Sequence, residues 1–403
     1  MRFVFLQSEL KSKTNSHFYQ YLQAIEEVLV EQGHACLTVA NELFEKEQSD
    51  QNTTISFRNH TSRYSNPFAV LWRIMSRNIS TCIEFKQIME FISKQHPKTV
   101  FFIDTIQNER IIALAWAFRK LARKNVSVSM AVVFRFTYQS NSFVLTWLQK
   151  KLHSAFCYLL HDLIVEKRCL LFTDSKLLQE AYAKNISEPV TVLPIPLRSD
   201  IYQQIQSQKK NSTSVRTIGF IGGKIAYKGL DLFLIQLVLL AKLDVRFLIH
   251  GVRDTEELIQ FAQLVLSSKQ LHILQQNIDK IEVCSQLNER EYFNLFQRMD
   301  LILIPYTSLQ FAQGTSNIFA ESVAAGVIPF VPLETWMGDE LIRAGFQQLV
   351  VNFSDDQSAY CCIADVIEDS VVLKQKINDF SSTWRSYHSS VNFVNRFIQA
   401  LQV

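Results

Sequence analysis

Residues 314–332, GTSNIFAESVAAGVIPFVP, are predicted to form a turn, a short helix and a buried strand. Gly314 and the hydroxyl residues after it are typical of a helix start, and VIPFVP is a short apolar run of the kind found in buried strands. The helix consists of small and apolar residues with a single carboxylate, Glu321. A lone charge among apolar residues requires an explanation, which the other predicted elements of this half of the chain provide.

The same alternation of strand and helix extends through the second half of the chain. Helical patterns separate four strand-like runs upstream of this stretch, which are TIGFIGG, VRFLIHG, IEVC and DLILIPY. Strands that alternate with helices in this way form parallel sheets with helices on both faces. We therefore expect residues 216–382 to fold as one Rossmann-like, doubly wound α/β domain.

A second domain of the same kind is predicted for residues 1–198. Its strand-like runs are MRFVFLQ, KTVFFIDT, VSVSMAVVFRF, CLLFTD and VTVLPIPL. Residues 45–66 are polar and lack periodicity, whereas residues 66–95 and 142–165 have helical patterns. Residues 199–215 are polar, as expected of a linker between two domains. Residues 383–403 form a predicted final helix that can pack back on the first domain.

The composition is that of an ordinary globular protein, with 48% hydrophobic and 20% charged residues among 403. No apolar run reaches the roughly 18 to 20 residues of a membrane span, and the first ten residues do not resemble a secretory signal. We therefore expect a cytoplasmic protein. Its seven cysteines are scattered and include no CxxC pair, so neither a disulfide framework nor a zinc site is expected.

Positive charge is concentrated in the first half of the chain. Residues 1–200 contain 24 Lys and Arg against 18 Asp and Glu, although the net charge is only +3. Two clusters stand out, which are Arg119, Lys120, Arg123 and Lys124, and the pair Lys150 and Lys151. They can be a solvated helix face. Alternatively, they meet an anionic acceptor or anionic lipid headgroups, which would place the protein at the inner face of the membrane. A nucleic-acid partner is not expected.

Ligands of doubly wound sheets bind beyond the carboxyl ends of the strands. One such end reads FIGGKIAYKG, where Gly222 and Gly223 let a phosphate approach the backbone and Lys224 and Lys228 neutralise its charge. Two glycines at a strand end can also be a simple tight turn. His250 follows another strand in LIHG and either lines the same site or has a structural role.

The helix that contains Glu321 begins at the same edge of the sheet. With Thr315 or Ser316 as N-cap, its free N–H groups and positive dipole end point at an anionic ligand. Glu321 lies roughly 7 Å along the helix at about 1.5 Å per residue, which matches the span from a diphosphate to a ribose. A carboxylate accepts two hydroxyl hydrogens, so a vicinal diol suits it. The alternative is an exposed charge on a surface helix.

These two motifs resemble the donor half of GT-B glycosyltransferases, and most of all glycosyltransferase family 4. The likeness is carried by GFIGGKIAYKGLDLFL and QGTSNIFAESVAAGVIPFVP, and it covers residues 216 to about 345 well. The resemblance implies the GT-B fold, in which two Rossmann-like domains face each other across a cleft. It also implies that residues 1–198 bind the acceptor, and that residues 216–382 bind a nucleotide-diphosphate sugar.

The resemblance assigns roles to individual residues. Glu321 corresponds to the family's ribose ligand, and Lys228 to the lysine that contacts the diphosphate. The family's other glutamate, which contacts the donor sugar, falls on Gln313. Its arginine falls on Gly223, next to Lys224, and a histidine of the first domain corresponds to Arg135. We expect Arg135 either to contact a phosphate or an acidic acceptor, or to have a plain surface role.

The function predicted from the sequence is that of a bacterial-type sugar transferase that retains the anomeric configuration and needs no metal. The alternative is a non-catalytic GT-B module that binds a nucleotide, a glycan or a protein; an epimerase is a third possibility. The predicted catalytic residues are Lys224, Lys228, Gln313 and Arg135. The predicted nucleotide-sugar ligands are Gly222, Gly223, Lys224, Lys228, His250, Gln313, Gly314, Thr315, Ser316, Asn317 and Glu321.

Overall fold

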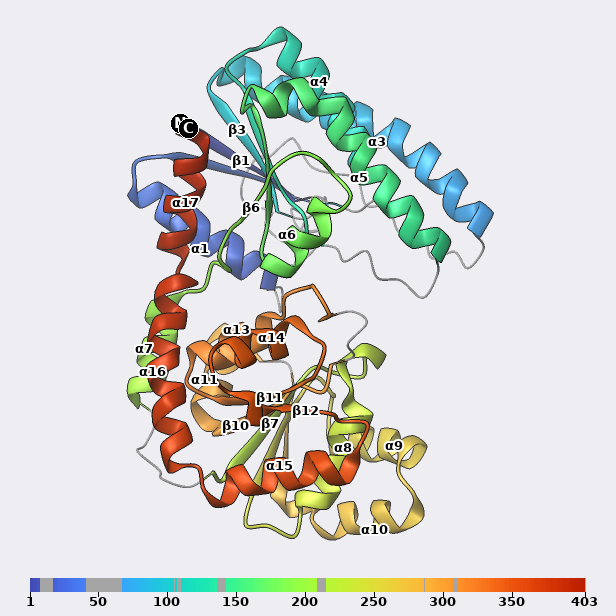
Figure 1. Ribbon diagram of the computed structural model, residues 1–403, viewed down its shortest axis with the longest axis vertical. Coiled ribbons are helices and arrows are strands. Elements are labelled where there is room, and N and C mark those ends of the chain that lie inside the picture. The colour runs from blue at the N-terminus through green and yellow to red at the C-terminus, as the bar shows by residue number, and fades with distance from the viewer. Residues whose placement is uncertain are drawn as a thin grey trace. The chain divides into compact units, whose positions relative to one another are not determined.

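The computed structural model describes residues 1–7, 17–40, 67–104, 106, 110–135, 143–208, 215–285, 287–306 and 311–402. The predicted loop at residues 45–66 lies outside these ranges. The chain forms two compact units (Figure 1). Unit 1 comprises Met1–Pro196 and Ser390–Val403, and unit 2 comprises Leu197–Ser389. No helix in the described ranges is both long and apolar enough to cross a membrane.

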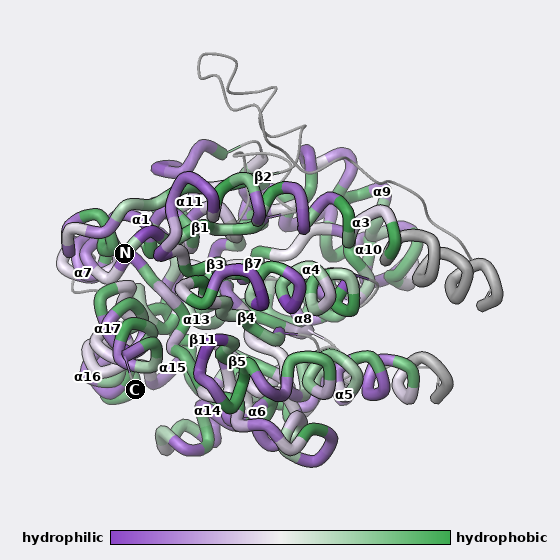
Figure 2. The backbone as a smooth tube through the Cα atoms, turned by 90° about the horizontal axis from the view of Figure 1, so that it is seen from above, coloured by the Kyte–Doolittle hydropathy of each residue, from purple (hydrophilic) through white to green (hydrophobic). Residues whose placement is uncertain are grey.

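Unit 1 contains a six-stranded parallel sheet in the order β2-β1-β3-β4-β5-β6. The strands are β1 Arg2–Gln7, β2 Ala35–Ala40, β3 Thr99–Ile103, β4 Ser129–Val133, β5 Cys169–Thr173 and β6 Val190–Val192. The helices are α1 His17–Glu31, α3 Pro67–Gln95, α4 Ile111–Lys124, α5 Phe143–Val165, α6 Lys176–Ala183 and α17 Ser390–Gln402. The helices α3, α4 and α5 run side by side (Figure 2).

Both faces of this sheet are covered because successive side chains of a strand point to opposite sides. Val4 and Leu6 of β1 belong to a core shared with α3, α4 and α5. Phe3 and Phe5 face the other way, into a core shared with α1 and α17. Phe397 of α17 packs into this core, since its ring centroid lies 5.1 Å from that of Phe102 and 5.7 Å from that of Phe3.

Unit 2 contains a second parallel sheet in the order β12-β11-β10-β7-β8-β9. The strands are β7 Thr217–Ile221, β8 Arg246–His250, β9 Ile281–Cys284, β10 Leu301–Leu303, β11 Ile328–Pro332 and β12 Val350–Val351. The main helices are α7 Ser199–Gln208, α8 Leu230–Leu240, α9 Thr255–Val265, α10 Ser268–Gln276, α11 Glu289–Arg298, α13 Asn317–Ala324, α14 Trp336–Arg343, α15 Asp356–Glu368 and α16 Val371–Tyr387. The prediction of two doubly wound sheets is confirmed.

Two segments differ in detail from the sequence-based expectation. Residues 199–208, expected as part of an exposed linker, form α7, and Tyr202 on this helix is buried with its ring centroid 5.6 Å from that of Phe293. The polar composition hid this helix because only a narrow stripe of it is apolar. Residues 383–403, expected as one helix, contain the end of α16, a break at His388, and α17.

Candidate functional site

The candidate site lies where the strand order of unit 2 reverses, between β7 and β10. In doubly wound sheets this switch point opens a crevice beyond the carboxyl ends of the two strands. β7 ends at Ile221, directly before the predicted Gly222 and Gly223. The Tyr306 hydroxyl, just after β10, donates a 2.8 Å hydrogen bond to the Ile221 carbonyl oxygen. This bond holds the two strand ends together.

Glycines bring the turn after β7 into close contact with the segments that follow β8 and β10. Gly229 has φ +66°, and a Cβ there would lie 2.1 Å from the Pro305 carbonyl oxygen. Gly223 has φ +71°, and its Cβ would lie 2.9 Å from the carbonyl oxygen of Gly251. Both positions therefore require glycine for conformation and space. The tight-turn interpretation accounts for Gly223, which is buried in this contact.

Lys228 ends the short 3-10 helix η2, Ala226–Lys228, and is surrounded by aromatic rings. Its ammonium nitrogen lies 4.1 Å from the ring centroid of Tyr306, 5.6 Å from that of Phe311 and 5.9 Å from that of Tyr227. Burial lowers the pKa of Lys228 to about 8, while the Glu321 carboxylate limits this shift. The half-buried ammonium therefore stays largely protonated at neutral pH, and an anion beside it would raise its pKa.

Glu321 lies inside unit 2, and only 1% of its surface is exposed. Its Oε2 accepts a 2.6 Å hydrogen bond from the hydroxyl of Tyr292 on α11. Burial raises the pKa of Tyr292 well above its usual value, and the charge of Glu321 adds to this, so the hydroxyl remains a donor. The interpretation of Glu321 as an exposed surface charge is wrong.

The helix that contains Glu321, α13, is held at both ends. Ser316 is its N-cap, and the Ser316 Oγ accepts a 3.3 Å hydrogen bond from the Phe319 N–H. At the other end, the Arg385 guanidinium donates to the Ala324 carbonyl oxygen at 2.7 Å. The predicted ligands Gln313, Gly314 and Thr315 form the turn into this helix, and Asn317 is its first residue. The first N–H groups of a helix have no partner within it, so this turn can bind an anion.

Lys224, which was expected to bind a diphosphate, forms an ion pair within the protein. The side chain is partly exposed, and its ammonium forms an ion pair with Glu257 on α9. Glu257 also accepts a 2.6 Å hydrogen bond from the Arg253 N–H. The positive charge of Lys224 is therefore already compensated, and a phosphate would have to compete with Glu257 for it.

His250 lies next to the hydrogen-bonded pair of Tyr292 and Glu321. Its Nδ1 is 2.8 Å from the Cys284 carbonyl oxygen, and because a carbonyl only accepts, Nδ1 carries the proton. The His250 ring centroid is 6.1 Å from that of Tyr292. His250, Tyr292 and Glu321 thus form one group. Sequence reasoning missed Tyr292, because a tyrosine on the apolar side of a helix looks like an ordinary core residue.

Arg135 lies in unit 1, just after β4, and is not a surface residue. Its guanidinium contacts Asp104 Oδ1 at 2.6 Å and Asp174 Oδ2 at 3.7 Å. Burial alone would lower the pKa of Arg135, but these carboxylates outweigh it and raise the pKa. Burial raises the pKa of Asp104, which Arg135 opposes. Since two carboxylates offset the charge of Arg135, the geometry disfavours a contact with a phosphate or an acidic acceptor.

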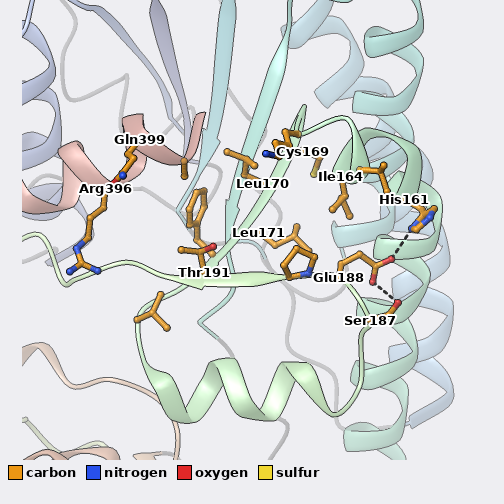
Figure 3. A pocket seen from close by; sticks show the side chains of 16 residues that line it. His161, Ile164, Cys169, Leu170, Leu171, Ser187, Glu188, Thr191, Arg396 and Gln399 are labelled. Carbon is orange, nitrogen blue, oxygen red and sulfur yellow. Dashed lines mark hydrogen bonds and ion pairs between the residues drawn. The ribbon is translucent and has the colours of Figure 1, made fainter. Parts of the chain in front are cut away.

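A separate pocket of about 760 Å³ lies in unit 1 between the end of α5, the strands β5 and β6, and α17 (Figure 3). Its walls are mostly apolar, and its polar groups include Arg396 and a His161–Glu188 contact of 3.2 Å. None of the predicted site residues lines it. The pocket therefore belongs to a different part of the molecule from the candidate nucleotide site.

Comparison with known proteins identifies the fold but no family. No protein-family model matches the sequence, and no curated protein matches it. Solved structures do match over the whole chain. Sucrose-phosphate synthase from Thermosynechococcus elongatus has a TM-score of 0.67 at 11% identity, with 100% of this chain and 98% of that chain covered.

Two further structures are similar to the same extent. A glycosyltransferase from Rickettsia africae has a TM-score of 0.66 at 13% identity, with 100% of this chain and 97% of that chain covered. HepE from Anabaena, in complex with UDP, has a TM-score of 0.65 at 12% identity, with both chains covered in full. The chain therefore has the GT-B fold, with two Rossmann-like domains.

The Tyr292–Glu321 hydrogen bond generates a stability prediction. Tyr292→Phe should lower the free energy of unfolding by about 1.5 to 3 kcal/mol, since it removes a hydrogen bond to a buried charge. Tyr306→Phe is the matched control, because it removes a bond to the neutral Ile221 carbonyl and should cost about 1 kcal/mol. Denaturant unfolding measures both. Equal losses would show that Glu321 is not held as a charged acceptor.

Proposed function

We propose that the protein is a glycosyltransferase that transfers a sugar from a nucleotide-diphosphate sugar. The observation that carries this proposal is the combination found at the switch point of unit 2. The half-buried ammonium of Lys228 interacts electrostatically with the buried carboxylate of Glu321, which raises the pKa of Lys228 against the effect of burial and lies five residues beyond the N-cap of α13. The UDP complex of HepE, a protein of the same fold, supports a nucleotide as the ligand.

The donor would bind along α13. The diphosphate contacts Lys228 and the N–H groups at the start of the helix, from Thr315 to Asn317, with Gly222 beneath it. The ribose hydroxyls donate to Glu321. A carboxylate has about four lone-pair sites, so the bond from Tyr292 orients it without exhausting its acceptors. His250 and Lys224 flank the nucleotide.

The reaction that we propose retains the anomeric configuration. The bond between the sugar carbon and the diphosphate oxygen breaks while the acceptor hydroxyl forms a new bond on the same face. The leaving phosphate oxygen takes the acceptor's proton, so no separate base is needed. Lys228 and the dipole of α13 stabilise the negative charge on the leaving group. Gln313 donates or accepts a hydrogen bond with a sugar hydroxyl, and the scheme needs no metal.

Residues 1–198 would bind the acceptor in this scheme, and residues 216–382 the donor. In unit 1 the strand order reverses between β1 and β3. Gln7 is the last residue of β1, and Asp104 directly follows β3. Asp104, Arg135 and Asp174 would face the acceptor as a fixed polar cluster. A neutral, hydroxyl-rich acceptor suits such a cluster better than an anion. We place the enzyme in the cytoplasm.

A non-catalytic binding module is the second candidate. Gln313 stands where the resemblance to family 4 places a glutamate, and an amide cannot carry the negative charge of a carboxylate. The ion pair of Lys224 with Glu257 also reduces the positive charge available to a leaving group. Both features are compatible with a protein that binds a nucleotide without turnover.

The proposed role of Lys228 predicts a specific loss of affinity. Lys228→Met should weaken binding of a nucleoside diphosphate by about 1.5 to 3 kcal/mol, the range for a hydrogen bond to a charged group, and leave a free nucleoside unaffected. Calorimetry with a panel of nucleoside diphosphates measures this. Lys242→Met is the control, because Lys242 also lies over an aromatic ring, that of Tyr360 at 4.4 Å. Equal loss for nucleoside and diphosphate would contradict the assignment.

The same role predicts a pH dependence of binding. Only protonated Lys228 attracts the diphosphate, and its pKa in the free protein is about 8. The affinity of the wild type should therefore fall above pH 8, by about tenfold per pH unit until the pKa of the complex is reached. Between pH 7.5 and 9.5 the Lys228→Met affinity should stay flat. A flat profile in the wild type would show that Lys228 does not contact the diphosphate.

Experiments on Gln313 distinguish a working transferase from a non-catalytic binding module. A working transferase should slowly hydrolyse at least one nucleotide sugar and release the α-sugar from an α-linked donor. Gln313→Glu should change which donor is preferred, because a carboxylate accepts hydrogen bonds but does not donate them. Nucleotide release and NMR of the product sugar provide the readout. Nucleotide binding without turnover in both proteins, across a broad donor panel, would favour the module.

A further inference from the structure

We propose that the outer side of the helices α3, α4 and α5 binds to an anionic membrane surface. This outer helical surface is defined by Ile79, Ile83, Trp116, Lys120, Arg123, Trp147, Lys151 and Tyr158. The inference rests on unit 1 alone and does not depend on the proposed transferase activity. It concerns the basic clusters of the sequence, which the candidate nucleotide site leaves unexplained.

The three helices form one layer with α4 in the middle (Figure 2). Lys124 of α4 forms a 3.0 Å ion pair with Glu90 of α3. On its other side, Arg119 donates to the Leu159 carbonyl oxygen and lies 3.4 Å from Asp162 Oδ2 of α5. These bonds fix the layer side by side over the sheet, so each helix turns one side away from the core.

The outward side carries large apolar side chains that would normally be buried. Tyr158 is 81% exposed, Trp116 is 53% exposed and Trp147 is 52% exposed. On α3, Ile79 is 69% exposed and Ile83 is 54% exposed. Ile79 and Ile83 are four residues apart on α3, and Trp147 and Tyr158 are eleven residues apart on α5, about three helical turns, so each pair lies on one face of its helix. Exposed large apolar residues gathered on one face indicate an interaction surface.

Basic residues are interleaved with these apolar ones. Lys120 and Arg123 follow Trp116 at helical spacing on α4 and are exposed. On α5, the ammonium of exposed Lys151 lies 5.9 Å from the ring centroid of Trp147. The structure thus refines the cluster predicted from the sequence. Arg119 and Lys124 are engaged within the layer, whereas Lys120, Arg123 and Lys151 are directed outward beside tryptophans.

This combination fits a lipid surface better than a protein partner. The cores of protein–protein interfaces are depleted in lysine, and docking a protein here would bury Lys120 and Lys151. On anionic lipid, by contrast, tryptophan and tyrosine rings sit at the headgroup level, and lysine and arginine extend to the phosphates. Two carboxylates at the borders of the three helices, Glu90 and Asp162, form ion pairs with Lys124 and Arg119.

Co-sedimentation of the full chain with vesicles tests the proposal. The protein should pellet with phosphatidylcholine vesicles that contain about 30% phosphatidylserine and not with pure phosphatidylcholine. About 0.5 M salt should release it, because the screening length shortens to a few ångströms. Tryptophan fluorescence should shift to shorter wavelength on binding, since Trp116 and Trp147 enter the interface.

Charge variants show whether this particular surface is responsible. The double variant Lys120→Glu/Arg123→Glu should lower the vesicle affinity by about tenfold or more. Lys176→Glu/Lys184→Glu changes the net charge equally at the first residue and the C-cap of α6, outside the surface, and should bind like the wild type. Circular dichroism confirms that both variants are folded.

Four results would overturn the proposal. These are absence of vesicle binding, equal binding to neutral vesicles, equal loss in both double variants, and self-association that Lys120→Glu/Arg123→Glu abolishes while vesicles remain unbound. The last result would identify the surface as a contact between two copies of the chain.

Discussion

The hydrogen bond from Tyr292 to the buried carboxylate of Glu321 is the interaction on which the candidate site depends. A buried charge without partners is costly in free energy, so a carboxylate that is 1% exposed must be compensated nearby. Tyr292 supplies a donor at 2.6 Å, and the Lys228 ammonium supplies opposite charge. This requirement ties α11, α13 and the turn after β7 into one arrangement at the switch point of the sheet.

The carboxyl ends of the strands carry different charged groups in the two units. In unit 2 the edge offers an ammonium with a lowered pKa and the start of a helix, which together suit an anionic ligand. In unit 1 the corresponding edge contains a guanidinium whose charge two carboxylates offset. This difference in charge supports our proposal of an anionic donor bound by unit 2 and a neutral acceptor bound by unit 1.

The sequence predicted the fold well because hydrophobic periodicity is a local signal. The strands β1 and β7 through β11 follow apolar runs. The neighbouring residues also narrowed the N-cap of α13 to Thr315 or Ser316, and the structure shows that it is Ser316. The partners within the site could not be predicted. Tyr292 lies 29 residues from Glu321, and Asp104 lies 31 residues from Arg135, so only the folded sheets bring them together. The likeness in sequence assigned Lys224 to the diphosphate, but it could not reveal that Glu257 pairs with it.

The most direct test of the account compares a nucleoside diphosphate with its 2′,3′-dideoxy analogue on the wild type and on Glu321→Ala. If Glu321 holds the ribose, removal of the hydroxyls should cost the wild type about 1 to 3 kcal/mol in calorimetric binding free energy. The folded variant should bind the natural ligand more weakly, but it should show little further loss with the analogue, because both changes remove the same interaction. Losses that add in full would show that Glu321 does not contact the ribose, and would contradict the proposed donor site.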